Sequence, residues 1–408
     1  MWLLTLAASS AAYAKTALGP LQESIRIALS LTDNQMAMLQ GPALALPMVI
    51  VAIPLGLLID RYSRARLLLG LCTLNLLCSG LTAAAPSFAV LFAVRCVIGL
   101  TAFTITPVVL SVLADLYAPA QRGRATMIMT VGQYGGAAAA FALGGSLLAT
   151  RGIAAEAWRS AMLWLTLPLV AILLLTAVVR EPTRTDIVVA PSSIRISCTE
   201  FWQLRAFIVP VLLGVALTEM GLGASLVWSA PTLARDFGLA PQRVGVTMAG
   251  VLLVSGVLGT IVGGLIADLC QRQRGPARTM VVLASLALIG APGGLFAVMP
   301  GVVSAGALLI LFVASTSATG VMGGTLLTVV VPNELRGLCL ALLFAAGAIV
   351  GVGVAPLTVS LLSGVLGGPT TIGTALTIVC VAASLVSAAM ITIGIRPLTR
   401  MAPTAALN

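Results

Sequence analysis

Residues 54–68 read PLGLLIDRYSRARLL and join the end of one long apolar run to the start of the next. Gly56 and Asp60 are one helical turn apart, so they share a face at the end of the first helix. The short link that follows carries three arginines: Arg61, Arg64 and Arg66. This combination of spaced Gly and Asp with a basic link is the most distinctive feature of the chain.

A weaker copy of this pattern lies in the second half of the chain. Residues 264–268 read GLIAD, and three arginines follow: Arg272, Arg274 and Arg278. A positively charged cytoplasmic loop would explain the arginines, but neither the Gly/Asp spacing nor its recurrence. A second repeat pairs PAQRG at 119–123 with PNELRG at 332–337. These ordered repeats indicate two duplicated halves, a plan typical of transporters.

The composition is that of a membrane protein. Charged residues make up 8% of the chain and hydrophobic residues 59%, with a mean hydropathy of +1.12. A soluble chain carries about a quarter charged residues, so this surface must face lipid. The apolar runs extend for about twenty residues or more, which argues against the short alternating strands of a β-barrel. The net charge of +10 lies in short links, so we expect the lipid bilayer and no nucleic acid as partner.

Apolar windows predict an all-α polytopic membrane protein with twelve transmembrane helices. They cover 2–25, 35–59, 67–85, 88–117, 125–149 and 158–179, then 206–233, 242–267, 279–299, 302–331, 338–363 and 371–395. We expect two pseudo-symmetric six-helix bundles, at 1–179 and 206–408, joined by a cytoplasmic central linker at 180–205. The start of the first window resembles a signal peptide but lacks its basic region, so we expect a helix there.

The distribution of arginines predicts the orientation. With both termini in the cytoplasm, the inner links and the tail hold fifteen arginines and the outer links five, as the positive-inside rule requires. We expect an integral protein of a bacterial inner membrane. The seven cysteines show no metal-ligand spacing and histidine is absent. We therefore expect no metal, disulfide or cofactor.

The Gly-x-x-x-Asp-Arg-x-x-Arg-x-Arg pattern at 56–66 resembles the signature loop of the major facilitator superfamily. Arg95 and Gly99 fit that superfamily's Arg-x-x-x-Gly pattern in the fourth helix. The chain also looks loosely similar to spinster-type carriers and bacterial anion symporters. It departs from them at Lys15-Thr16, where spinster-type members carry Asp-Arg, and at Ala102, where several members carry a carboxylate. The resemblance implies two six-helix bundles around a central cavity.

Three ionisable residues stand out deep within predicted spans, where an uncompensated charge is costly: Lys15, Arg95 and Glu219. The resemblance implies that their helices line the cavity. We expect Lys15 and Arg95 to bind substrate; the alternative for Arg95 is a brace between helices. We expect Glu219 to carry a coupling proton; the alternative is a fixed ion pair with one of the two cations. Further candidates for substrate contact, each with a helix-packing alternative, are Gln133, Tyr134 and Trp228.

Charged residues at the predicted cytoplasmic helix ends indicate two gating clusters. The first comprises Asp60, Arg61, Arg64, Asp115 and Arg122, and the second comprises Asp268, Arg272, Glu334 and Arg336. A partly shielded ion network can bias a two-state equilibrium by about 1–2 kcal/mol, which is enough to affect gating. We therefore expect these residues to set the conformational balance without touching the substrate.

These observations predict a monomeric secondary carrier that moves a small organic anion by rocking-bundle alternating access, with proton symport. Two buried cations against one buried acid favour the anion. The alternative is a proton-driven efflux carrier for drugs, sugars or lipid-like amphiphiles. The absence of the Gly-Pro pair that the superfamily's drug antiporters carry counts against it. We expect no enzyme, because no nucleophile with a base and no metal site is evident. The duplicated halves disfavour a channel, whereas a transport-inactive sensor remains open.

Overall fold

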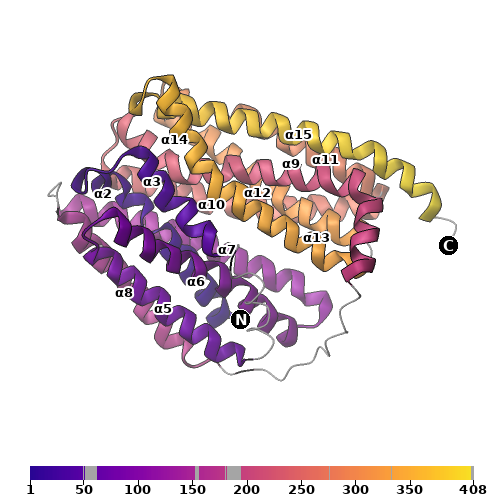
Figure 1. The fold of residues 1–408 in the computed structure, drawn as a ribbon, viewed down its shortest axis with the longest axis horizontal. Coiled ribbons are helices and arrows are strands. Elements are labelled where there is room, and N and C mark those ends of the chain that lie inside the picture. Colours follow the sequence, from indigo (N-terminus) through magenta and orange to yellow (C-terminus); the bar gives the residue numbers. More distant parts are fainter. Residues whose placement is uncertain are drawn as a thin grey trace. The chain divides into compact units, whose positions relative to one another are not determined.

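The computed structural model describes residues 1–48, 50, 62–151, 156–179, 181, 194–274, 276–331 and 333–405. Within these residues every regular element is a helix (Figure 1), so the all-helical fold predicted from the sequence is confirmed. Some of the predicted gating residues lie outside this description: Asp60 and Arg61 entirely, and the side chains of Arg272, Glu334 and Arg336.

The first predicted span consists of two helices with a break between them. α1 (Trp2–Thr16) is followed by a 3-10 turn, η1 (Gly19–Leu21), and then by α2 (Gln22–Ala28). Pro20 lies in this turn, and its missing N–H removes a hydrogen bond that a continuous helix would use. Hydropathy alone does not indicate this break, because it does not register backbone hydrogen bonding.

α3 (Asp33–Gln40) begins with a capping box. The Thr32 N–H donates to Gln35 Oε1 at 2.9 Å, and the Gln35 N–H donates to Thr32 Oγ1 at 3.2 Å. These bonds satisfy N–H groups that the first turn leaves without partners. The helices that follow in the first half are α5 (Arg64–Ala84), α6 (Phe88–Leu116), α7 (Pro119–Arg151) and α8 (Ala157–Thr176).

The second half begins with the long helix α9 (Ile194–Arg235), whose first residues fall within the predicted linker. The elements after it are α10 (Pro241–Arg274), α11 (Pro276–Gly293), η2 (Gly294–Val298), α12 (Val302–Val330), α13 (Asn333–Ala346), η3 (Gly347–Val354), α14 (Ala355–Leu366), η4 (Pro369–Thr371) and α15 (Ile372–Ala405). η3 is a π-helix and contains three glycines. Such widened turns are rare, and they occur often at functional sites.

Nine helical segments of the described chain are long and apolar enough to cross a membrane. The predicted spans that have no counterpart among them are 2–25, 35–59 and 125–149. The first is broken at η1, and much of the second lies outside the described residues. The third corresponds to α7, which is 33 residues long but rich in glycine and alanine, so its hydropathy is lower.

The helices pack into two compact units. Unit 1 comprises Met1–Ile187, Leu226–Val254 and Pro356–Gly373, and unit 2 comprises Val188–Ser225, Ser255–Ala355 and Thr374–Asn408. The core of unit 1 includes Leu4, Leu68 and Ile105. The core of unit 2 includes Phe207 and Met322. Segments from the second half of the sequence thus pack with the first half in unit 1.

Candidate functional site

Arg95 lies in α6 and caps the C-terminal ends of two other helices. Its side chain is fully buried, with 1% exposure. Nε donates to the Leu39 carbonyl at 3.2 Å, and Nη2 donates to the Lys15 carbonyl at 3.0 Å. Leu39 and Lys15 are in the last turns of α3 and α1, where carbonyl groups lack intrahelical partners and carry the negative end of the helix dipole. The geometry is that of the brace that the sequence left open as an alternative.

Gly99 explains the second half of the Arg-x-x-x-Gly pattern. It lies one turn after Arg95 on α6, and a Cβ at this position would collide with the backbone of Leu44. Without that atom, α6 approaches the segment after α3 backbone to backbone. Arg95 therefore fastens α6 to the ends of α1 and α3, and Gly99 brings α6 against the chain that follows α3.

Lys15 occupies the last turn of α1, directly before the break in the first span. Its side chain is half-buried, and Nζ lies 5.5 Å from the centroid of the Phe103 ring of α6. A cation is favoured at a helix C-terminus and over an aromatic face. Discontinuous helices of this kind frequently form the substrate sites of transporters.

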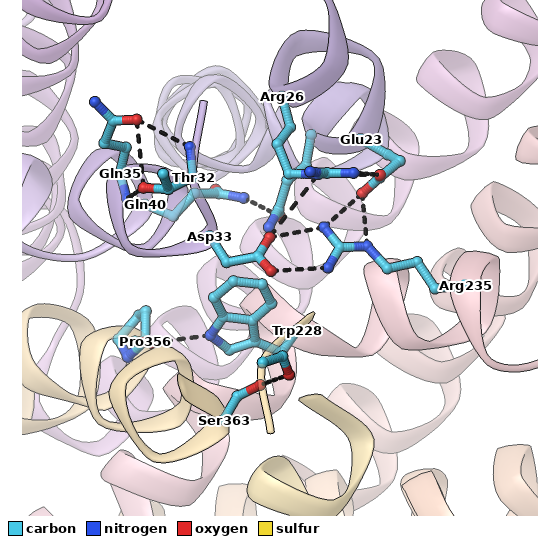
Figure 2. Close-up of polar contacts among 12 residues, drawn as sticks. Glu23, Arg26, Thr32, Asp33, Gln35, Gln40, Trp228, Arg235, Pro356 and Ser363 are labelled. Atoms are coloured by element: carbon cyan, nitrogen blue, oxygen red, sulfur yellow. Dashed lines mark hydrogen bonds and ion pairs between the residues drawn. The ribbon is translucent and has the colours of Figure 1, made fainter. Parts of the chain in front are cut away.

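The other predicted substrate contacts have different environments within unit 1. Gln133 and Tyr134 are half-buried on α7, and Gln133 Nε2 donates to Thr106 Oγ1 of α6 at 2.9 Å. Trp228 is fully buried, and its indole N–H donates to the Pro356 carbonyl at 2.9 Å (Figure 2). This bond uses the only polar atom of the Trp228 side chain, so substrate contact by Trp228 stays a prediction.

Glu219 belongs to α9 in unit 2, and glycines surround it. A Cβ on Gly320 of α12 would lie 3.0 Å from Glu219 Oε1, and a Cβ on Gly347 of η3 would lie 3.5 Å from Glu219 Cγ. At Gly351, also in the π-helix, an added Cβ would lie 2.7 Å from the Glu219 carbonyl oxygen. The half-buried side chain therefore occupies space that these residues leave by having no side chain.

Arg64 connects two carboxylates in a group that we call the Arg64 cluster: Arg64, Ser111, Asp115 and Glu181. Nη2 lies 2.6 Å from Asp115 Oδ2 and Nε lies 3.0 Å from Glu181 Oε1, while Nη1 donates to the Ser111 carbonyl at 3.1 Å. The Arg64 and Asp115 side chains are each 5% exposed. Two of the predicted gating residues are thus paired in a largely buried site.

Glu181 joins this cluster from the start of the predicted central linker and caps the N-terminus of α5. Its Oε2 accepts hydrogen bonds from the Ser63 hydroxyl at 2.8 Å and the Ala65 N–H at 2.7 Å. Partial burial raises the pKa of Glu181, but the bonds from Ala65, Arg64 and Ser63 outweigh it and bring the pKa to about 2. Glu181 is therefore ionised at any physiological pH.

Two further predicted gating residues, Arg122 and Asp268, have different environments. Arg122 donates from Nη2 to the Ala114 carbonyl at 2.7 Å and from Nε to the Tyr117 carbonyl at 3.2 Å, and so braces the turn between α6 and α7. Asp268 is exposed on α10. The role of both in gating stays a prediction, as does that of the residues outside the description.

A second charged group, which we call the Arg235 cluster, comprises Glu23, Arg26, Asp33 and Arg235 (Figure 2). Arg235 donates to Glu23 Oε2 from Nε at 2.9 Å and Nη2 at 2.7 Å, and to Asp33 from Nη1 at 3.1 Å and Nη2 at 2.8 Å. Arg26 Nη2 lies 2.6 Å from Glu23 Oε1. The i, i+3 spacing of Glu23 and Arg26 indicates local pairing, but no sequence signal links Asp33 to Arg235, 202 residues away.

Comparison with known proteins relates this chain to a family and to solved structures. A sequence profile of the Major Facilitator Superfamily matches residues 4–356, whereas no curated protein shows a significant match. Among solved structures, a bacterial homologue of the human lysosomal transporter Spinster, inward-facing and unoccupied, superposes with a TM-score of 0.81 at 20% identity, over 98% of this chain and 97% of that one.

Two further solved structures share the fold. A D-xylose-proton symporter superposes with a TM-score of 0.71 at 17% identity, over 95% of this chain and 96% of its own. The nucleoside transporter NupG superposes with a TM-score of 0.71 at 13% identity, over 96% of this chain and 99% of its own. At these identities the likeness establishes the fold alone, and it confirms the fold predicted from the sequence.

Proposed function

The chain belongs to the major facilitator superfamily, and we propose that this member carries a small organic anion across the membrane by alternating access. Membership makes it an integral membrane transporter of the secondary type, which binds a small-molecule substrate and is not an enzyme. The class of the solute and the coupling ion rest on the residues of this chain.

The observation that carries the proposal is the burial of Arg95. Its permanent charge is removed from solvent, and the two carbonyl oxygens that it contacts hold only partial charges. Among the described residues no carboxylate forms an ion pair with Arg95. A positive electrostatic potential therefore remains in this part of unit 1, and it favours an incoming carboxylate or phosphate.

Lys15 is the side chain that we assign to direct contact with the anion. It is half-buried beside Phe103, and the bond from Arg95 to the Lys15 carbonyl fixes the turn that carries it. Lys15 then supplies a point charge with three donors. Gln133 and Tyr134, half-buried on α7, are proposed as additional contacts. Direct contact of Arg95 with the substrate stays a prediction.

Glu219 is proposed to carry a coupling proton. A carboxylate within a membrane helix is costly when ionised, so protonation relieves that cost and an approaching cation reverses it. The glycines around it and the neighbouring π-helix give the side chain room to change its contacts. The likeness to a D-xylose-proton symporter supports the compatibility of this fold with proton coupling.

We also propose a monomer in a bacterial inner membrane, with both termini in the cytoplasm and a central linker at 180–205 between six-helix bundles. The excess of arginines in the predicted inner links supports this orientation. Fusion of a reporter enzyme to each terminus measures it directly. Activity of either fusion on the outer side of the membrane would contradict the proposed orientation.

Binding to the purified carrier tests the anion proposal. Heat unfolding is followed with succinate, gluconate, glucuronate and a lysophosphatidate, with D-xylose as the neutral probe and tetraphenylphosphonium as the cationic one. At least one anion should raise the unfolding temperature, and Lys15→Gln should weaken its binding by roughly tenfold or more. Arg66→Gln, which removes the same charge from an exposed position, should bind as the wild type does. Stabilisation by the neutral or cationic probe alone would favour the efflux alternative.

Transport by the Glu219→Gln variant tests the coupling. Gradient-driven accumulation should be lost, whereas exchange at equal concentrations should persist because it needs binding and alternation but no net proton movement. Gly320→Ala sharpens this test, because the added Cβ would lie 3.0 Å from Glu219 Oε1 and should impair coupling while the carboxylate is kept. Normal accumulation in Glu219→Gln would assign Glu219 a structural role.

A further inference from the structure

The Arg235 cluster joins the two halves of the sequence within unit 1. Arg235 is the last residue of α9, which belongs to the second half, while Glu23 and Asp33 lie in α2 and α3 of the first half. Figure 2 shows the guanidinium between the two carboxylates, with hydrogen bonds to both. A single side chain therefore holds a helix of one half against two helices of the other.

The Arg235 cluster is partly shielded from solvent. Two carboxylates face two guanidinium groups, and the side-chain exposures are 17% for Arg235, 11% for Asp33 and 27% for Glu23. Charge-assisted bonds from a planar fork are stronger than neutral ones, and partial burial protects them from screening. The bonds remain close enough to solvent that water can replace them when the groups separate. Such a contact is strong enough to hold a conformation and weak enough to open.

A second and independent contact joins the same two halves. Gly145 of α7 and Gly245 of α10 meet backbone to backbone, both within unit 1. A Cβ on Gly145 would lie 2.6 Å from the Pro241 carbonyl oxygen, and a Cβ on Gly245 would lie 2.5 Å from the Phe141 carbonyl oxygen. Glycine at both positions permits this close crossing without any bond that would make it permanent.

We propose that the Arg235 cluster is a latch. It holds closed the end of the transport path at which α2, α3 and the end of α9 meet, and its ion pairs must break for that end to open. The glycine crossing is the apolar part of the same closure. This inference rests on the proposed alternating access, but it assigns the closing contact to named residues and requires no knowledge of the substrate.

A cysteine introduced at a buried position on α9 can report the opening of this end. Ser229 lies on α9 within unit 1 and has 0% exposure, so Ser229→Cys should react slowly with a membrane-impermeant maleimide while this end is closed. The purified full chain is reconstituted in lipid nanodiscs, and the labelling rate is measured by mass spectrometry. The chain without this substitution gives the background from the native cysteines.

Variants of the latch are then compared in the Ser229→Cys background. Arg235→Gln should raise the labelling rate by roughly tenfold, the effect of losing a partly buried charge network on a two-state equilibrium. The double variant Glu23→Gln/Asp33→Asn should raise the rate equally. Because this variant leaves α9 unchanged, its effect cannot come from the loss of a bulky side chain near the reporter. Arg243→Gln removes an exposed arginine and should leave the rate unchanged.

The combined variant distinguishes a latch from separate structural effects. Adding Arg235→Gln to Glu23→Gln/Asp33→Asn should change the labelling rate little further, because the interaction is already lost. Arg235→Lys keeps the charge but loses the fork, and should give an intermediate rate. Fast labelling of the reporter in the unmodified latch, or equal rates in all variants, would overturn the proposal. Neither result would affect anion binding, so the two proposals fail independently.

Discussion

The Arg64 and Arg235 clusters have the same design but different origins in the sequence. In each, one arginine lies between two carboxylates. Arg64 pairs with Asp115 and Glu181, all from the first half of the sequence, and the Arg64 and Asp115 side chains are each 5% exposed. Arg235 comes from the second half, pairs with first-half residues and is 17% exposed.

From this difference we infer that the Arg64 cluster acts as a brace within one half, whereas the Arg235 cluster is a contact that can be broken; gating by Arg64 and Asp115 stays a prediction. Under the proposed alternating access, ion pairs within one half need not change when the halves move, so deep burial there carries no kinetic cost. An ion pair between halves would have to exchange its partners for water in every cycle, and a fully buried one would be too costly to open. The greater exposure of Arg235 fits that requirement.

The largest effect is expected from removing the arginine of the Arg64 cluster. Arg64→Gln leaves the buried Asp115 without its arginine, which should lower stability by about 3–5 kcal/mol. Heat unfolding of the purified protein measures this, with exposed Arg66→Gln as control. Adding Asp115→Asn should recover much of the loss. An unfolding temperature equal to that of the control would show that the Arg64 cluster is not a brace.

The next effect is on the glycine crossing. Gly245→Ala places a Cβ 2.5 Å from a backbone carbonyl oxygen, and this overpacking costs about 1–3 kcal/mol in the closed form. Labelling of the Ser229→Cys reporter should rise by roughly tenfold. Gly250→Ala on the same helix is the matched control, since nothing lies within 4 Å of its Cβ. Equal labelling in both variants would remove the crossing from the closure.

A smaller effect is expected from Glu181, the residue that the predicted linker contributes to the Arg64 cluster. Glu181→Gln should lower stability by about 1 kcal/mol, a value reduced by solvent screening at a side chain that is 29% exposed. The pKa of Glu181 falls from 4.5 to about 2 on folding. Its contribution is therefore complete above pH 4.5 and is lost as the pH falls through 2. The difference from wild type in heat unfolding should be constant between pH 5 and pH 8; a difference that varies over that range would contradict the assignment.

The smallest effect is expected at Arg26. It pairs with Glu23 within α2, and its Nε lies 3.9 Å from Asp33, so it ties no second-half helix to the cluster. Arg26→Gln should change reporter labelling by less than about twofold, as for an exposed pair. An increase as large as that of Arg235→Gln would mean that the total charge of the cluster, and not the link between halves, keeps this end closed.

The sequence predicted the fold well because membrane spans and duplicated loops leave signals that composition and spacing reveal. It also indicated that Arg64 and Asp115 belong together, since both lie at predicted cytoplasmic helix ends. The capping role of Arg95 was foreseen only as an alternative. A buried arginine can satisfy carbonyl groups or bind an anion, and the choice depends on where other helices end.

Contacts between residues far apart in the sequence leave no such signal. The pairing of Asp33 with Arg235 and the meeting of Gly145 with Gly245 depend on how helices pack, not on any local pattern. The predicted roles of Asp60 and Arg61 in gating remain predictions, and Asp60→Asn should shift reporter accessibility without changing substrate affinity.

Uptake by proteoliposomes tests the central claim, carriage of an organic anion, most directly. Wild-type carrier is reconstituted and supplied with the anion that stabilises it most, with and without an imposed proton gradient. We expect saturable uptake above that of protein-free liposomes, enhanced by the gradient and reduced severalfold in Lys15→Gln but not in Arg66→Gln. Saturable uptake of D-xylose or tetraphenylphosphonium without uptake of any anion would contradict it.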